Sequence, residues 1–507
     1  ALAVNDLEND TLAYLQDTEV LDAADAQILA LAGGEQLAIA IGAAINASAE
    51  QDKAASAAGS VSVSLAENRV AAYALDATAS GDGSGDLDLI AYDRTRLGTG
   101  GGSLIVGGAG GLKGIGAAVT YSDIGNTVEA YVAGSTLSGY RAGRIEALSN
   151  AKLAAGGAMF GFTNDEADTT FAGAVVLSEI DNTTRAEVKA SSKVTLTQSL
   201  HVLARDTTPV AALDQIVDAQ DGGHANSASL DYDATELGED PDPGSSILSV
   251  AGVVQVGAGN VGVSFARSTI GNSYTASLDD SVVDVTAGDV QVLALAATRI
   301  DSYAVGVGWA TDEFAGAGSV TLNEIANPVT ASVGTATGKA LDSDTLTVRA
   351  EDRSRIGSLA GQVTISQGSK AIGAAVAHNE IDNTLTAGAS GLALDTQRET
   401  AIEAINESAI RTWSATAGGA EDFAFNGSAS HARIANTTEA LLSGSSADNP
   451  LALVTVVARD DSAIWSRSGG AALATGETGV GAALAVNRIG NTTKAHVSGA
   501  AADRDYR

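Results

Sequence analysis

The acidic loop at residues 82–88 carries the residue types best suited to a chemical role. It reads Asp-Gly-Ser-Gly-Asp-Leu-Asp, with oxygen-bearing side chains at alternate positions. A hard cation such as Ca²⁺ takes about six to eight oxygen ligands and is commonly held by such loops. We therefore predict a calcium site formed by Asp82, Ser84, Asp86 and Asp88, and calcium is the only cofactor that the sequence suggests. A solvated acidic loop is the alternative, because the distal glutamate of an EF-hand is missing.

A second acidic cluster lies between residues 206 and 246, a stretch that also holds three of the five prolines. The same two interpretations, calcium ligands or solvated acids, apply to it. Its members are Asp231, Asp233, Glu236, Glu239, Asp240 and Asp242.

Catalytic constellations are not evident, and we expect no enzyme. The chain has no cysteine, which excludes thiol nucleophiles, disulfides and zinc-thiolate sites. The motif Gly-x-Ser-x-Gly is missing, and the five histidines recur at no fixed place. They are His201, His224, His378, His431 and His496.

Overall charge narrows the range of partners. Lys and Arg number 28 against 62 Asp and Glu, for a formal net charge of −34. Such a field repels nucleic acid and anionic lipid. No apolar run reaches the roughly 18–20 residues of a transmembrane helix, so we expect no membrane insertion in this segment.

Repetition is the strongest signal in the sequence. The phrase Asn-x-Ile-x-Asn-x-x-x-Ala-x-Val recurs, and the numbers of successive second Asn residues differ by 59, 58, 56, 90, 55, 56, 53 and 55. These marker residues are Asn9, Asn68, Asn126, Asn182, Asn272, Asn327, Asn383, Asn436 and Asn491. The difference of 90 equals one period plus an insertion, which places an acidic insertion loop at 206–246 within one continuous solenoid over 1–507.

Marker asparagines have two interpretations. Asn tolerates a left-handed backbone at a corner, and stacked copies form an amide ladder in which each side chain donates and accepts. The alternative is a row of exposed ligand-binding amides. Alternating apolar residues frame each marker, which favours the structural ladder.

Strand periodicity sets the fold class. Stretches such as 345–350 and 289–293 alternate apolar and polar residues with a period of two. A second phrase, Ala-x-Asp/Asn-x-Ser/Thr-x-Ile/Leu, recurs in register at 350–356, 404–410 and 458–464. We predict an all-β, right-handed parallel β-helix or β-solenoid of about nine repeats of roughly 55 residues, with four to six strands per repeat. Glycine doublets such as Gly33-Gly34, Gly156-Gly157 and Gly469-Gly470 are assigned to its corners.

Coil size fixes the expected dimensions. Coils of roughly 18–28 residues would give two or three per repeat and a rod very roughly 85–130 Å long. A string of small β-sandwiches is the rival architecture, and the lack of linkers between repeats disfavours it. No signal peptide is visible, and we read the chain as a fragment of a longer one.

The repeat resembles a known one. The stretch Ala485–Val497, echoed in 119–132 and 376–387, is similar to the unit of leukotoxin-type filamentous adhesins and related giant repetitive surface proteins of bacteria. The resemblance implies an extracellular or cell-surface rod and carries no catalytic residues.

The expected function is a structural, non-enzymatic rod or fibre segment of a large adhesin-like protein, contacting surface or matrix components, glycans or its own copies. One alternative is a polysaccharide-binding or polysaccharide-cleaving β-helix. Parallel β-helices often host such enzymes, but only Trp309, Trp413 and Trp465 could stack on a sugar, and basic residues are few. The other alternative is a self-assembling sheath or filament subunit.

Overall fold

Each repeat makes one complete coil, and successive coils stack in parallel register. The computed structural model describes residues 1–46, 55–107, 113–163, 169–206, 210, 213, 244–285, 287–334, 340–391, 393–444, 446–447 and 453–499. One coil consists of β20 (Arg355–Ser366), β21 (Lys370–Ile381), β22 (Thr384–Ser390) and β23 (Ala393–Asn406). The next coil begins with β24 (Ala409–Ala420), which pairs in parallel with β20. The predicted all-β parallel solenoid is confirmed.

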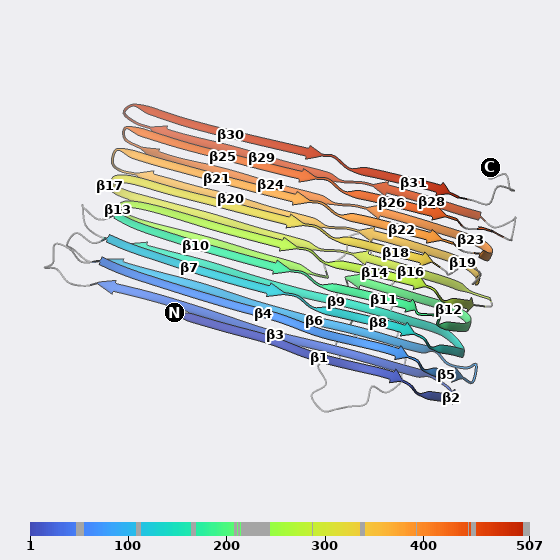
Figure 1. Cartoon of the computed structure of the whole chain (residues 1–507). Helices are drawn as coiled ribbons and strands as arrows, with labels where there is room; N and C mark the ends of the chain where they lie inside the picture. Colours follow the sequence, from blue (N-terminus) through green and yellow to red (C-terminus); the bar gives the residue numbers. More distant parts are fainter. Residues whose placement is uncertain are drawn as a thin grey trace.

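The strands form four rows that run the height of the stack (Figure 1). Row one holds the second parts of β3 (Ala26–Asn46), β6 (Leu87–Gly107) and β9 (Thr136–Phe162), whose first parts lie in row four, the first parts of β13 (Ser246–Ile270) and β17 (Arg299–Ile325), then β20, β24 and β29 (Ala463–Ala474). Row two holds the first parts of β1 (Leu2–Gln16) and β4 (Ala55–Leu75), whose second parts lie in row three, then β7 (Lys113–Ile124), β10 (Thr169–Ile180), the second parts of β13 and β17, β21, β25 (Phe423–Ile434) and β30 (Thr478–Ile489).

Rows three and four complete each coil. Row three holds β8 (Thr127–Ala133), β11 (Thr183–Lys189), β14 (Ser273–Asp279), β18 (Pro328–Gly334), β22, β26 (Thr437–Ser443) and β31 (Thr492–Ser498). Row four holds β2 (Glu19–Ala23), β5 (Thr78–Gly81), β12 (Lys193–Asp206), β15 (Val282–Val285), β16 (Asp289–Ala296), β19 (Ala340–Asp352), β23, β27 (Ser446–Ala447) and β28 (Leu453–Asp460).

The predicted coil number and rod length are wrong. The pairing of β20 with β24 sets Arg355 beside Ala409, which is the same position of the next repeat, so a repeat makes one coil and not two or three. Nine coils at about 4.8 Å rise to only about 43 Å, whereas rows one and four together run about 25 residues, or about 80 Å. The shape is therefore a broad flat slab, as Figure 1 shows.

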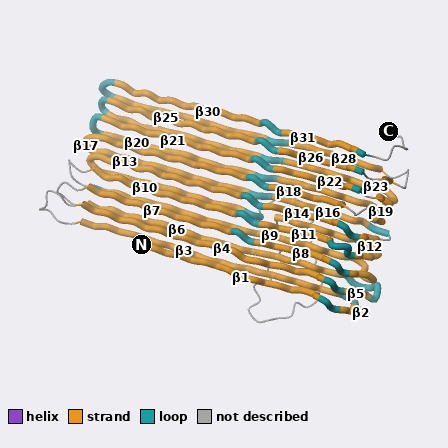
Figure 2. The backbone as a smooth tube through the Cα atoms, viewed as in Figure 1, coloured by secondary structure: helices purple, strands orange, loops and turns teal. Residues whose placement is uncertain are grey.

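A kink divides the coils into two halves. From Asn126 onward the chain leaves the strand conformation at each marker Asn, where Figure 2 shows a column of short loops between rows two and three, and from residue 297 onward it also does so at the Asp-x-Ser position of the facing sheet. In the first coils β1, β3, β4, β6 and β9 run through these positions without a break. We call the part between the kink and the turn from row one to row two the tip half. The part between the kink and the turn from row three to row four is the corner half.

The two halves have different interiors. Buried Leu, Val, Ile and Ala side chains fill the corner half in one cluster, including Leu89, Val292 and Val348. In the tip half the buried residues beyond the first Ile or Leu are mostly Ala, Gly, Ser, Thr and Asn. Hydrogen bonds such as that from Gln362 Nε2 to Asn426 Oδ1, 2.8 Å, cross between its two sheets.

Glycines allow these two sheets to approach closely. A Cβ added at Gly308 would lie 2.7 Å from Asn260 Oδ1 and 3.1 Å from the carbonyl oxygen of Gly316 on the facing strand. The assignment of glycine doublets to corners is wrong, because Gly33-Gly34, Gly156-Gly157 and Gly469-Gly470 lie inside β3, β9 and β29.

The predicted insertion leaves the solenoid at the kink. β12 ends at Asp206, and β13 begins at Ser246, where the chain re-enters the same coil just past the position of Asp206. The hydroxyl of Ser245 donates to Asp206 Oδ1 at 2.7 Å, so the Asp-x-Ser contact is restored across the interruption. Val210 and Leu213 pack on an outward apolar cluster that includes Tyr92. Most of 206–246 lies outside the described residues.

Candidate functional site

Marker asparagines form a continuous buried ladder from Asn68 to Asn491. The backbone N–H of Asn126 donates to Oδ1 of Asn182 in the next coil at 2.8 Å, and the same contact joins each successive pair. The side chains from Asn68 to Asn436 are at most 3% exposed. From Asn126 onward, each amide oxygen therefore holds the backbone of the coil before it.

Two details differ from the expected amide ladder. The acceptors receive backbone N–H groups rather than neighbouring side-chain amides, and no marker Asn among the described residues has a positive φ. Asn9 is in register with Asn68, but its side chain is exposed on the first coil. The kink itself, and not a left-handed residue, presents the backbone N–H to the next coil.

Amide nitrogens of the ladder point across the core to the Asp-x-Ser row. Asn126 Nδ2 donates to Asp93 Oδ2 at 2.8 Å, and Asn383 Nδ2 donates to Asp352 Oδ1 at 2.8 Å. Ser354 donates its hydroxyl to the same carboxylate at 2.9 Å. A buried polar wall thus separates the corner half from the tip half.

Three carboxyl groups in this wall have raised pKa values. Burial raises the pKa of Asp93 to about 7 and that of Asp352 to about 6, although hydrogen bonds from Thr95 and Ser354 oppose the shift. Burial likewise raises the pKa of Asp206 to about 7. These groups are buried proton-binding positions inside the fold.

The side-chain oxygens of the predicted calcium loop form hydrogen bonds and ion pairs with other groups of the protein. Asp82 Oδ1 accepts from the backbone and hydroxyl of Ser84 at 2.9 and 2.6 Å. Asp86 forms a two-pronged ion pair with Arg141 of the next coil, at 3.1 and 2.9 Å. Asp88 is buried and accepts from Arg144 Nε at 2.8 Å. Two arginines therefore neutralise the carboxylates that were expected to hold the cation.

No group of three or more His, Asp or Glu side chains in the described part of the chain is placed to hold a metal ion. The second acidic cluster, from Asp231 to Asp242, lies outside the described residues.

Two of the five histidines share a position, which the sequence interpretation missed. His378 and His431 are in register on β21 and β25, and their rings stack with centroids 4.8 Å apart. Burial and the neighbouring His431 lower the pKa of His378. The separation of these two histidines by one period of the repeat was the available signal.

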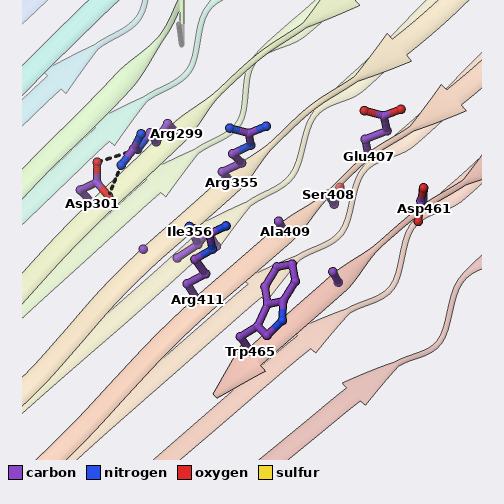
Figure 3. Close-up of a pocket in the computed structure, with 12 residues that line it drawn as sticks. Arg299, Asp301, Arg355, Ile356, Glu407, Ser408, Ala409, Arg411, Asp461 and Trp465 are labelled. Carbon is purple, nitrogen blue, oxygen red and sulfur yellow. Dashed lines mark hydrogen bonds and ion pairs between the residues drawn. The ribbon is translucent and has the colours of Figure 1, made fainter. Parts of the chain in front are cut away.

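A shallow depression on the outer face of row one is lined by charged side chains and a tryptophan. It has a volume of about 640 Å³, and small residues at Gly357 and Ala409 create it between larger ones. Figure 3 shows Arg299, Arg355 and Arg411 along one side, Glu407 and Asp461 along the other and Trp465 at the rim.

Arg411 lies over the Trp465 ring at 5.3 Å, and Arg299 pairs with Asp301 at 2.7 Å. Such a surface binds an anionic planar group by guanidinium contacts. The hydroxyl of Ser408, which lines the depression, is buried and donates to Asn406 Oδ1 at 2.6 Å, so it is not a free nucleophile.

Comparison with models of protein families, with curated proteins and with solved structures finds no match for this chain. Within the described residues, no helix has the length and apolar character needed to cross a membrane.

Proposed function

We propose that this chain is a structural, non-enzymatic segment of a large extracellular surface protein of a bacterial cell. The observation that carries the proposal is the unbroken asparagine ladder. Side-chain amides that could have bound ligands are consumed, coil after coil, in holding the backbone of the preceding coil. The resemblance of the repeat to bacterial filamentous adhesins supports the same role and the same location.

The geometry favours a surface over a spacer. Each repeat adds only about 4.8 Å to the height of the stack, but it adds two outer sheet faces about 80 Å across. The gain in length is small for so many residues, so we infer that the segment works by presenting surface area.

Two measurements test this proposal. Electron microscopy of the purified chain is expected to show flat particles about 80 Å by about 43 Å, and a thin rod longer than about 85 Å would contradict it. Incubation with extracellular polysaccharides is expected to release no reducing or unsaturated ends. Reproducible release that heat-denatured protein does not give would replace the structural role with an enzymatic one.

The outer depression favours polysaccharide binding as a second candidate. Arg355 and Arg411 beside Trp465 offer charge for a uronate and an indole face for the sugar ring. Binding of polygalacturonate, measured by calorimetry, is expected to weaken at least tenfold in Arg411→Ala with Trp465→Ala. The substitution Thr330→Ala, on the outer face of β18, is the matched control. Equal binding by all three proteins would remove this candidate.

A further inference from the structure

The outer surface of the tip half is apolar on both faces. Between Val61 and Phe425, which excludes the two terminal coils, every exposed large hydrophobic side chain of the described residues lies in this half. Examples on the row-one face are Val305, Trp309 and Val363, and on the row-two face Ile372 and Val376, each 39–40% exposed. The apolar side chains that normally fill a core here point to the outside.

Charge is scarce in this apolar band. Charged residues make up 18% of the chain, yet the strand segments of the band, taken in a common register of seven residues, contain only Arg267 and Arg467 among Asp, Glu, Lys and Arg. On the row-one face these segments are 39–45, 100–106, 156–162, 250–256, 303–309, 359–365, 413–419 and 467–473. On the row-two face they are 57–63, 115–121, 171–177, 261–267, 316–322, 372–378, 425–431 and 480–486.

Charges return at both margins of the band. At the kink, Arg299, Arg355 and Arg411 follow one another on the row-one face. At the tips, the described turns are mostly acidic, with Asp312-Glu313 and Glu421-Asp422, although Lys370 ends one of them. The seven residues in common register span about 23 Å. That length is close to the apolar band of about 25 Å on membrane-spanning β-strands.

Aromatic residues mark the same margins. Trp413 and Trp465 lie beside the kink, where Arg467 stacks over the Trp413 ring at 4.9 Å. Trp309 and Phe162 lie next to the tips. Tryptophan and arginine at the edge of an apolar band are typical of the boundary between headgroups and hydrocarbon.

We propose that the tip half inserts edge-on into a lipid bilayer, with both apolar faces against acyl chains, the arginine margin at one headgroup layer and the acidic tips at the other. The interior suits this position. Its Ser, Thr, Asn and Gln side chains are buried between the two sheets and not exposed to lipid, and some of them bond across the interior, as Asn379 Nδ2 donates to Thr412 Oγ1 at 2.6 Å. The edge strands of the first and last coils must be paired in hydrocarbon, so the bound form joins its edges to those of another copy.

A second copy is the competing occupant of the band. Two flat apolar faces would also stack against the faces of a neighbouring slab. The formal charge of −34 per chain, however, opposes such stacking in water. Stacking between copies also does not require the length of the band to match the thickness of a bilayer.

The three tryptophans make the test direct, because all lie on the row-one face at the margins of the band. The chain is mixed with phosphatidylcholine vesicles, with and without bromine on the acyl chains. Insertion is expected to shift tryptophan emission to shorter wavelength, and the brominated lipid is expected to quench at least half of it.

The variant carrying Val363→Asp and Val376→Asp places one charge on each face at side chains that are 40% exposed, so its melting temperature in water is expected to stay unchanged. It is expected to lose the quenching, whereas Thr330→Asp, a charge on the corner half, retains it. Absence of shift and quenching in the unmodified chain overturns the proposal. If the unmodified chain instead self-associates in sedimentation velocity and the double variant does not, the band is a contact between copies and the lipid assignment is wrong.

Discussion

The buried carboxyl group of Asp352 should make the protein less stable as pH rises from about 4 to about 6. Burial raises its pKa from 3.8 to about 6 in the folded chain. The folded state therefore holds a proton that the unfolded state has already lost across this window. Since stability falls with pH wherever the folded state binds more protons, the free energy of unfolding decreases until the folded pKa is passed.

The size of the effect follows from the shift. About two pKa units at about 1.4 kcal/mol each give about 3 kcal/mol between pH 4 and pH 7. The substitution Asp352→Asn removes the titrating group, and Asn406 already occupies the equivalent position, where its Oδ1 accepts from Ser408 at 2.6 Å. Relative to the unmodified chain, the Asp352→Asn variant should therefore become more stable by about 3 kcal/mol as the pH rises over this range.

Urea unfolding followed by far-ultraviolet circular dichroism at half-unit steps of pH measures this difference. Because the net charge of −34 adds its own pH dependence, only the difference between variant and unmodified chain is diagnostic. The control Asp461→Asn removes a carboxylate that is 75% exposed and should run parallel to the unmodified chain. A difference for Asp352→Asn that stays constant from pH 4 to pH 7 would refute the reasoning.

Three further outcomes are expected. Asn383→Ala deprives two buried partners of hydrogen bonds and should lower the unfolding free energy by about 2–5 kcal/mol in urea unfolding. Gly308→Val, which forces the two sheets of the tip half apart, should cost about 1–3 kcal/mol, whereas Gly361→Val, with open space around its Cβ, should leave the urea midpoint unchanged. A chelator should not alter the melting temperature, since arginines already neutralise Asp86 and Asp88; a rise on adding calcium would restore the metal site.

Repeat spacing was sufficient to predict the solenoid, and the marker spacings coincide with the coil register in the structure. Asn327 and Asn383, one period apart in the sequence, are also one coil apart and joined by a hydrogen bond. Coil size could not be read in the same way, because a strand period of two is the same in a short coil and in a long one. Only the pairing of β20 with β24 distinguishes them.

Candidate sites were less predictable, because their partners come from other coils. Asp86 and Asp88 looked like cation ligands in the local sequence, but Arg141 and Arg144, one coil later, occupy them. The same limitation hid the pair of His378 and His431. A residue's neighbour in a solenoid is one period away, so a site has to be sought down the columns of the aligned repeats.

Aligning the repeats also reveals the apolar band, because apolar residues change from inward to outward positions at the kink. Along β19 the inward positions Leu346 and Val348 are apolar and the outward ones polar. Past Asp352, along β20, the inward side chains after Ile356 are polar or small, and the outward ones become apolar, at Val363 and Ile365.

No long apolar run arises from this pattern, so a search for transmembrane helices passes over it, and the expectation of no membrane insertion rested on that search. A strand needs only one apolar face to contact lipid. Because the inversion recurs at the position of the buried polar wall, where Asp93, Asp206 and Asp352 lie, we infer that the wall marks the change of environment. The corner half is folded as a protein is in water, and the tip half as a protein is in hydrocarbon.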